Sequence, residues 1–322
     1  MQVVRTLAPA LIGAVLLGAT SPVASASSSA EVAELYRVSP HRDLFSLATD
    51  RQDWVAVGAL GTVLESRDGG RHWTEEPLET MLSLLAVDID GGQAVGVGQM
   101  GLVAARTDKG WRIRPAAPTR ERLLAVATER GGLTAAVGAF GTVLVSADAG
   151  QSWQPAEIDW MELDPAGREP HLYDVHVEGN RILIVGEFGM VLESLNGGGS
   201  WQLLRRGDES LFALHVQGRN AYAVGQNGIV IRSVDSGSSW EQLETGVVAN
   251  LLGIASRDGS AEMIVSGMRA VLNSTDGGAT WDAIAGDDFS RHWYGDAAWS
   301  HALEGFVIVG GGGKIKQVNE QN

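Results

Sequence analysis

The chain has 322 residues and a formal net charge of −15, with 24 lysines and arginines against 39 acids, and it contains no cysteine. This acidity disfavours nucleic acid and anionic lipid surfaces as partners, because both are bound through lysine and arginine. The missing cysteines exclude a disulfide framework and a lipoprotein anchor.

The first 26 residues have the pattern of a secretory signal peptide. Arg5 gives the positive start, an apolar run covers residues 7–19, and Ala24-Ser25-Ala26 forms an A-x-A cleavage site. The apolar run is too short to predict a membrane span. We therefore expect a soluble periplasmic protein, without direct membrane insertion, whose mature part is residues 27–322.

From Leu44 onward, one block recurs about every 40 residues, which is the period of a β-propeller blade. The block contains V-G-x-x-G followed by S-x-D-x-G-x-x-W, and its clearest copy runs from Val57 to Trp73. We place the first motif position of the seven copies at Gly58, Gly98, Gly138, Gly186, Gly225, Ser266 and Gly310. The repeats predict an all-β, seven-bladed β-propeller.

Each copy predicts four short antiparallel strands. In the first copy, the innermost strand begins at Leu44, the next two cover residues 54–57 and 62–66, and the outermost begins at Trp73. The seventh copy stops after residues 314–316 without an outermost strand. We expect residues 34–38 to supply that strand, which would close the ring and remove an exposed sheet edge.

The S-x-D-x-G-x-x-W segment predicts a turn between the third and fourth strands. A carboxylate can accept hydrogen bonds from backbone N–H groups there, glycine permits a positive φ, and tryptophan buries a large apolar area. Each copy offers a single carboxylate, which disfavours a calcium site. We assign this structural role to Asp68, Trp73, Asp148, Trp153, Asn196, Trp201, Asp235, Trp240, Asp276 and Trp281.

These tandem motifs resemble those of Asp-box propellers, and specifically the photosystem II stability/assembly factor family. The resemblance covers about residues 31–318. It implies an exported, non-catalytic scaffold without a cofactor, which binds an early subunit of a membrane complex, in part through an arginine patch. Similar proteins occur in bacteria without a photosystem, where the resemblance implies an accessory role for another envelope complex, such as an export transporter. We expect a monomer.

Sialidases and other glycosidases share this turn, so a glycan-active or glycan-binding propeller is the alternative. Glycoside hydrolysis uses a tyrosine nucleophile or two facing carboxylates. All four tyrosines fall in predicted strands, and we interpret the acids of the longer loops as solvating groups. Two facing carboxylates at the channel mouth would favour the alternative, and exposed tryptophans would suit sugar stacking. The acidic candidates are Glu162, Asp164, Glu169, Asp287 and Asp288.

The loop between the second and third strands of a blade should share one face of the ring with the loop that leads into the next blade. We identify a large apolar residue in the first of these loops in five copies: Leu60, Met100, Phe140, Phe188 and Met268. Apolar loop tips rimmed by polar groups are typical of a protein-binding surface. The alternative is that each side chain packs as a wedge against the neighbouring innermost strand.

Arginines stand out in the loops that lead into the blades. Arg122, Arg205, Arg206 and Arg291 suit bidentate capture of a carboxylate, although ordinary surface salt bridges are the alternative. The longest insertion, residues 158–171, adds Trp160, and Trp293 lies beside Arg291. We predict that these residues bind a protein subunit of a membrane complex, together with the five apolar loop residues.

His176 and His215 share one innermost-strand position, which Asp88 fills in the second copy. Imidazole and carboxylate groups that line a channel can hold a metal. No third close ligand is evident, so we interpret these residues as channel-lining and predict no metal site.

Overall fold

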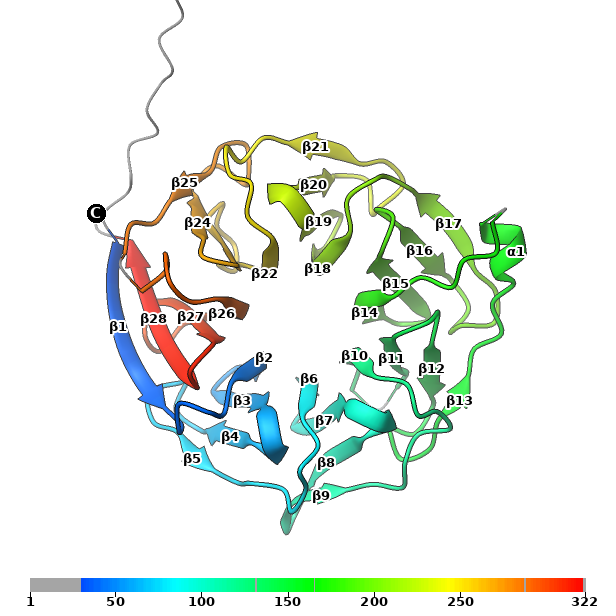
Figure 1. Ribbon diagram of the computed structural model, residues 1–322, viewed down its shortest axis with the longest axis horizontal. Helices are drawn as coiled ribbons and strands as arrows, with labels where there is room; N and C mark the ends of the chain where they lie inside the picture. Colours follow the sequence, from blue (N-terminus) through cyan, green and yellow to red (C-terminus); the bar gives the residue numbers. More distant parts are fainter. Residues whose placement is uncertain (1–29, 131, 165, 287, 321–322) are drawn as a thin grey trace, which may run out of the picture.

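The computed structural model describes residues 30–130, 132–164, 166–286 and 288–320, and it has the predicted seven-bladed β-propeller fold (Figure 1). Seven four-stranded antiparallel sheets are arranged in a ring. The expected signal peptide lies outside the described residues. No helix in the described part of the chain is long and apolar enough to span a membrane.

The strands of the first four blades follow the repeats in order. Blade 1 contains β2 (Leu44–Asp50), β3 (Asp53–Gly58), β4 (Val63–Ser66) and β5 (Thr74–Glu75). Blade 2 contains β6 (Leu84–Asp90), β7 (Gln93–Gly98), β8 (Val103–Thr107) and β9 (Gly110–Ile113). Blade 3 contains β10 (Leu123–Thr128), β11 (Thr134–Gly138), β12 (Val143–Ser146) and β13 (Gln154–Pro155). Blade 4 contains β14 (Leu172–Glu178), β15 (Arg181–Gly186), β16 (Val191–Ser194) and β17 (Gln202–Arg205).

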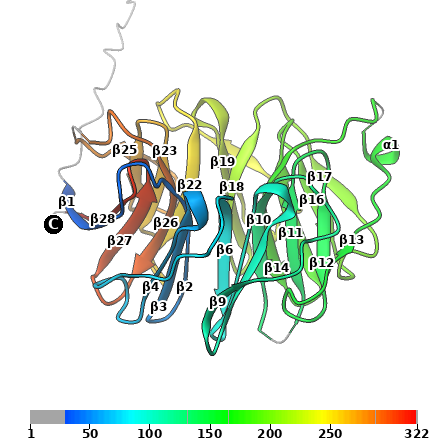
Figure 2. The same cartoon turned by 60° about the horizontal axis from the view of Figure 1, so that its bottom comes forward.

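The remaining blades complete the ring. Blade 5 contains β18 (Leu211–Gln217), β19 (Asn220–Gly225), β20 (Val230–Ser233) and β21 (Glu241–Leu243). Blade 6 contains β22 (Leu251–Ser256), β23 (Met263–Gly267), β24 (Val271–Ser274) and β25 (Asp282–Ala283). Blade 7 contains β26 (Tyr294–Ser300), β27 (Gly305–Gly310), β28 (Lys314–Glu320) and β1 (Ala30–Arg37). One short helix, α1 (Trp160–Leu163), stands in the insertion before blade 4 (Figure 2).

The predicted closing strand is present and is longer than expected. β1 pairs antiparallel with β28 from Ala30 opposite Glu320 to Arg37 opposite Lys314, with a register shift between Glu34 and Tyr36. The outermost strands differ slightly from prediction. In blade 1, for example, Trp73 precedes β5 instead of beginning it, and its side chain is buried.

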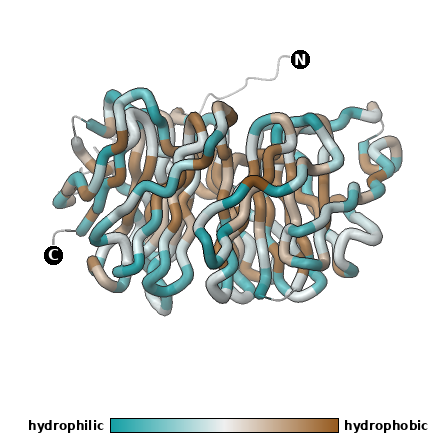
Figure 3. The backbone as a smooth tube through the Cα atoms, turned by 90° about the horizontal axis from the view of Figure 1, so that it is seen from below, coloured by the Kyte–Doolittle hydropathy of each residue, from teal (hydrophilic) through white to brown (hydrophobic). Residues whose placement is uncertain are grey.

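The apolar core is divided into layers between neighbouring blades. Val57 and Val63 of blade 1, for example, pack with Leu84 and Val87 of blade 2. Complete burial of one such leucine contributes about 2–3 kcal/mol. Apolar segments run along the strands between the two ends of the ring, where many loops are hydrophilic (Figure 3). The first residue of every innermost strand is fully buried: Leu44, Leu84, Leu123, Leu172, Leu211, Leu251 and Tyr294.

The first glycine of the motif is required by a close backbone approach. A β-carbon at Gly58 would lie 2.1 Å from the carbonyl oxygen of Asp43. In the sixth copy the same approach occurs at Gly267, where a β-carbon would lie 2.3 Å from the carbonyl oxygen of Asn250. Gly267 also pairs with Leu251, as Gly58 pairs with Leu44. Placing Ser266 at this position was therefore wrong by one residue.

Candidate partner-binding face

The two sets of loops lie on one face of the ring, which we call the rim face. In blade 1, the loop at residues 59–62 meets the loop at residues 76–83 that leads into blade 2. The backbone N–H of Gly61 donates to the carbonyl of Leu82, and the N–H of Leu78 donates to the carbonyl of Gly61, both at 2.9 Å. These bonds hold the loop tips in fixed positions around the channel mouth.

Four consecutive blades present a large apolar residue in the left-handed backbone region. The φ angles of Leu60, Met100, Phe140 and Phe188 are 55°, 56°, 52° and 58°. We call these residues the apolar arc. A left-handed conformation costs a bulky residue about 1–2 kcal/mol, so these positions would favour glycine or asparagine if stability alone mattered.

The other three blades carry polar residues or glycine at the same position. Asn227, Arg269 and Gly312 have φ angles of 56°, 60° and 73°. Because the sixth motif begins at Gly267, the equivalent residue is Arg269, and the predicted Met268 precedes it. Met268 is exposed, but it does not belong to the arc. At this loop position the residue is thus large and apolar in blades 1–4 and is polar or glycine in blades 5–7.

Most of the apolar arc is open to solvent. Leu60, Met100 and Phe140 are 39%, 52% and 58% exposed, which does not fit tightly packed wedges. Phe188 is partly covered, since the Arg168 guanidinium lies 4.1 Å from its ring centroid. Protein-binding surfaces often present such apolar side chains beside charged ones.

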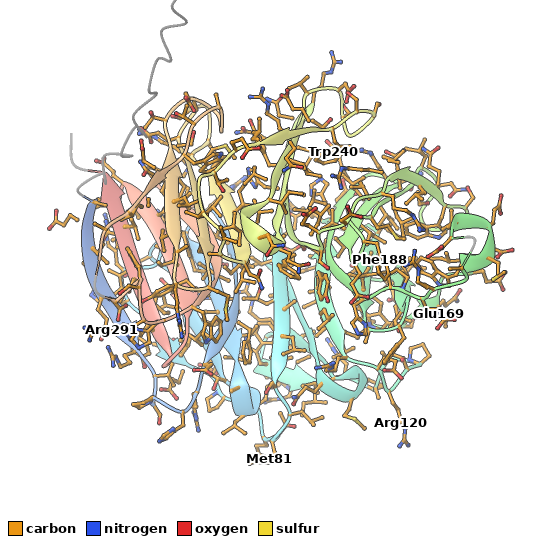
Figure 4. All side chains as sticks on the ribbon, turned by 45° about the horizontal axis from the view of Figure 1, so that its top comes forward. Met81, Arg120, Glu169, Phe188, Trp240 and Arg291 are labelled. Carbon is orange, nitrogen blue, oxygen red and sulfur yellow. The ribbon has the colours of Figure 1, made fainter. Side chains whose placement is uncertain are left out.

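Methionines extend this apolar surface. Met81 and Met161, which the sequence analysis did not assign to the site, are 77% and 67% exposed on loops that lead into blades 2 and 4. Figure 4 shows Met81 and Arg120 projecting from the edge of the ring. Flexible methionine side chains suit surfaces that adapt to a partner. Both methionines follow an outermost strand in the sequence, and this position could have indicated that they lie on the rim face.

Arg205 and Arg206 are held by contacts within the chain. Arg205 donates to the carbonyl of Gly189 at 2.7 Å, and desolvation lowers the pKa of its guanidinium. Arg206 Nη1 lies 3.2 Å from Asp164 Oδ1 and Nη2 donates to the carbonyl of Leu163 at 3.2 Å. Both side chains are only partly exposed, so their visible role is to fix loops on the rim face.

The insertion before blade 4 is anchored by a buried carboxylate. Asp164 accepts hydrogen bonds from Arg168 Nε at 2.7 Å and from the N–H of Ala166 at 3.0 Å. These bonds, with the pair to Arg206, hold the pKa of Asp164 well below its usual range. Asp164, an acidic candidate of the glycan-active alternative, is therefore an ion-paired structural group.

Trp160 packs inward instead of forming an exposed contact. It is partly buried against the core between blades 3 and 4, and a β-carbon at Gly141 would lie 2.6 Å from its Nε1. Asp159 caps α1 by accepting from the N–H groups of Met161 and Glu162 at 3.0 and 3.1 Å. The exposed apolar residue of this helix is Met161.

The remaining residues named in the sequence analysis differ in their exposure to solvent. Arg122 and Arg291 are exposed on the rim face. Trp293 is partly buried and stacks on Phe45, with ring centroids 5.8 Å apart and planes 10° apart. Asp288, an acidic candidate of the glycan-active alternative, pairs with Lys314 and with Lys316, the latter at 2.8 Å, and its side chain remains partly exposed. Glu162 and Glu169 are exposed, and Asp287 lies outside the described residues.

Three carboxylates line the central channel at innermost-strand positions. Asp174 and Asp296 occupy the third position, where other blades have serine, alanine or glycine, and Asp88 occupies the fifth. Each accepts a backbone N–H from the next blade: Leu214 at 2.7 Å, Leu47 at 2.9 Å and Thr128 at 2.7 Å respectively. They therefore join neighbouring blades, a role that the sequence analysis did not assign.

These channel groups have shifted pKa values. Burial, opposed by the backbone hydrogen bonds, raises the pKa of Asp174 to about 7 and those of Asp88 and Asp296 to about 6. Burial lowers the pKa of His215 to about 4, and its Nε2 lies 2.7 Å from Ser256 Oγ. No group of three or more metal-ligating side chains occurs within the described ranges.

The S-x-D turns have the hydrogen bonds that their composition predicts. In blade 3, Asp148 accepts from the N–H and hydroxyl of Ser152 at 2.8 and 2.6 Å and from Ser146 at 2.7 Å. These bonds lower the pKa of Asp148 to about 2. Asn196 accepts from Ser200 N–H in the same way at 2.9 Å, so this turn does not need a charge.

Three of the turn tryptophans donate a hydrogen bond within their own turn, whereas the Nε1 atoms of Trp153 and Trp281 have no hydrogen-bond partner among the described residues. Trp73 Nε1 donates to the carbonyl of Gly70 at 2.9 Å, and Trp201 and Trp240 make the equivalent bond at 3.1 and 2.9 Å. In the shortened second copy, Trp111 instead donates to Glu65 of blade 1 at 2.8 Å. The S-x-D turns thus connect the third and fourth strands of the blades. They lie on the face of the ring opposite to the rim face.

Comparisons with known proteins place the chain among propellers of this type. Solved structures that it resembles include YCF48 bound to a D1 peptide, with a TM-score of 0.70, 18% identity and coverage of 94% of this chain and 100% of that one. YCF48 from Cyanidioschyzon merolae gives a TM-score of 0.70 at 17% identity, covering 89% and 98% of the two chains.

A WD40 propeller, RRP9, is similar in fold alone, with a TM-score of 0.70 and 12% identity over 92% of this chain and 100% of the other. A search among curated protein sequences found no match. The family model described as photosynthesis system II assembly factor YCF48 matches residues 157–321, which include blades 4–6 and most of blade 7. Because this match covers half of its length, the chain belongs to the YCF48 assembly factor family.

Proposed function

We propose that this protein is a non-catalytic, monomeric scaffold that acts after export to the periplasm and binds a protein subunit of an envelope membrane complex through its rim face. The observation that carries the proposal is the apolar arc. Large side chains at Leu60, Met100 and Phe140 are exposed in a backbone conformation that disfavours them. Residues with backbone strain of this kind cluster at functional sites.

The family supports a protein partner. A solved relative is YCF48 bound to a D1 peptide, which is a protein segment. For this chain we propose the same class of partner: photosystem II in a photosynthetic host, and otherwise another envelope complex such as a transporter. Exposed Arg122 and Arg291 at the same face would add capture of an acidic segment or a carboxyl terminus.

The arc offers a test that separates binding from folding. Asn227 occupies the equivalent left-handed position in blade 5, so asparagine is compatible with this loop. Phe140→Asn and Met100→Asn should retain or raise the melting temperature, because asparagine tolerates a left-handed backbone better than phenylalanine or methionine. They should also reduce recovery of the partner at least tenfold in an envelope crosslinking pulldown analysed by mass spectrometry.

The matched control is Leu195→Asn. Leu195 is 63% exposed in the S-x-N turn of blade 4, away from the rim face, so its replacement removes a similar apolar group without touching the proposed surface. Equal recovery of the membrane subunit by wild type and both arc variants would contradict the proposal. Retention on glycan beads with no protein partner would favour the glycan-binding alternative instead.

A further inference from the structure

The central channel is a cavity of about 680 Å³ with an unusual lining. Its walls carry Asp88, Asp174 and Asp296, two histidines and several aromatic side chains, but no lysine or arginine. Cavities of this size are typical of small-ligand sites. The channel therefore concentrates acidic groups in a space large enough for a small molecule, without a lysine or arginine among the lining residues.

Aromatic rings stand at the end of the channel that opens on the rim face. Phe45 stacks on Trp293, and Tyr173 meets Phe212 edge to face with centroids 5.0 Å apart. Phe45, Tyr173 and Phe212 each occupy the second position of an innermost strand, one residue before the layer that holds Asp174 and Asp296. Aromatic faces above carboxylates favour a cation that also has an apolar part.

The carboxylates lack a cationic partner in the channel. The oxygen atoms of Asp174 and Asp296 accept backbone N–H groups, which stabilise the carboxylate but leave its charge in place. The carboxylates also repel one another, and this repulsion adds to burial in raising the pKa of Asp174. His176 Nε2 is buried and has no hydrogen-bond partner among the described residues. A bound cation would relieve this repulsion.

The arrangement does not suit a bare metal ion. The carboxylates stand on blades 2, 4 and 7, and no three ligating groups converge within the described parts of the chain. A molecule with ammonium groups spaced along an aliphatic chain can reach separate carboxylates. Its carbon atoms would meet the apolar wall formed in part by Leu85, Leu124 and Leu252.

We propose that the channel binds alkylammonium groups, which pair with Asp174, Asp296 and Asp88 and place their carbon chains against the aromatic mouth. The ligand is either a free aliphatic polyamine or lysine side chains of a bound protein segment. This inference does not depend on the apolar arc, because it rests on the residues that line the channel.

The test is calorimetric titration at pH 7.5 with putrescine, spermidine and a short peptide that contains two lysines. At least one of these ligands should bind and release protons, because a cation favours the ionised form of Asp174. We expect the heat to change between buffers of different ionisation enthalpy. Binding of the amines alone indicates a polyamine site, and binding of the peptide alone indicates a site for lysine side chains.

The deciding variant is the double substitution Asp174→Asn, Asp296→Asn, which should weaken binding at least tenfold. Asparagine keeps one oxygen, which can still accept the backbone N–H of the next blade from Leu214 or Leu47, but it loses the second acceptor that takes the N–H of the following residue. Trp293→Leu, which keeps the carboxylates, should weaken binding severalfold. The control Asp208→Asn removes an exposed acid outside the channel and should leave the affinity unchanged. Absence of binding, or an equal loss in the Asp208 variant, would overturn the proposal.

Discussion

Arg206, which follows the last strand of blade 4, is paired with Asp164, which precedes the first strand of that blade. The pair therefore ties together the loops on both sides of blade 4, at the part of the rim face that carries Phe188. Arg168 extends the connection, since it bonds to Asp164 and covers the Phe188 ring. These ion pairs hold the insertion at residues 158–171 in place on the rim face.

Removing the pair of Arg206 with Asp164 should loosen the insertion without unfolding the ring. In Arg206→Ala, Asp164 keeps Arg168 but loses its other ion pair, so residues 158–171 should become several times more sensitive to limited proteolysis. The melting temperature should fall by only a few degrees. Arg219→Ala, at an exposed arginine between β18 and β19, is the control. Unchanged cleavage of the insertion in Arg206→Ala would show that the pair does not hold the loop.

The channel carboxylates should make the free energy of unfolding fall as the pH rises from about 4 to about 7. Asp174 has a pKa of about 7 in the folded state. Between about pH 4 and pH 7 it therefore binds more protons in the folded chain than in the unfolded chain. Its contribution is therefore lost as the pH rises through this range, on the order of 1 kcal/mol between pH 6 and 8. His215, whose pKa is lowered, acts in the opposite direction at acidic pH.

Asp174→Asn should flatten this pH dependence, which chemical denaturation at pH 6 and pH 8 can measure. Because the whole chain is acidic, Asp208→Asn serves as the control for general charge repulsion. Identical slopes for the two variants would assign the effect to net charge and not to the channel.

The S-x-D turns should make the free energy of unfolding fall as the pH is lowered, which is the opposite of the effect of the channel carboxylates. The pKa of about 2 at Asp148 means that its contribution is present above the ordinary carboxyl pKa and is lost as the pH falls from about 4 towards 2. Asp148→Asn should keep the turn, as Asn196 does in blade 4, and should lose less stability between pH 5 and pH 3 than the wild type. The exchange Asn196→Asp should increase that loss. Denaturation midpoints at the two pH values check both.

The corrected position of the sixth motif predicts that replacing Gly267 or Ser266 by alanine lowers the free energy of unfolding by different amounts. Gly267→Ala would push a β-carbon against the carbonyl of Asn250 and should cost about 2 kcal/mol or more of unfolding free energy. Ser266→Ala should be nearly neutral, because the Ser266 hydroxyl is buried without a hydrogen-bond partner among the described residues. A larger loss for the serine variant would restore the original placement of the motif.

The fold was predictable because the same local structural requirements recur in the blades and leave the same residues in each repeat. Glycine is forced by a backbone approach, a buried leucine starts the innermost strand, and the S-x-D turn supplies its own hydrogen bonds. The sixth copy was misplaced because Ser266-Gly267-Met268 alone does not show which residue meets the carbonyl of Asn250. That contact joins residues far apart in the repeat, so only the strand pairing reveals it.

The positions of the loops on one face were predictable from the sequence, but the contacts of individual side chains of the candidate site were not. The apolar arc follows from the motif, whereas the roles of Arg206 and Trp160 depend on the path of an insertion that has no counterpart in other blades. Asp174 and Asp296 did leave a signal, since charged groups replace small residues at an innermost-strand position. The pairing of each carboxylate with the next blade is a property of the closed ring.

The pairing of β1 with β28 has a consequence for how the molecule is made. The residues of β1 leave the ribosome before any blade exists, and their partners in β28 emerge only after blades 1–6 and two strands of blade 7. Until then the first strand has no sheet to join, and contacts this distant in sequence form slowly. Completion of the ring must therefore wait until β28 has been synthesised, so the nascent polypeptide stays open while blades 1–6 are made.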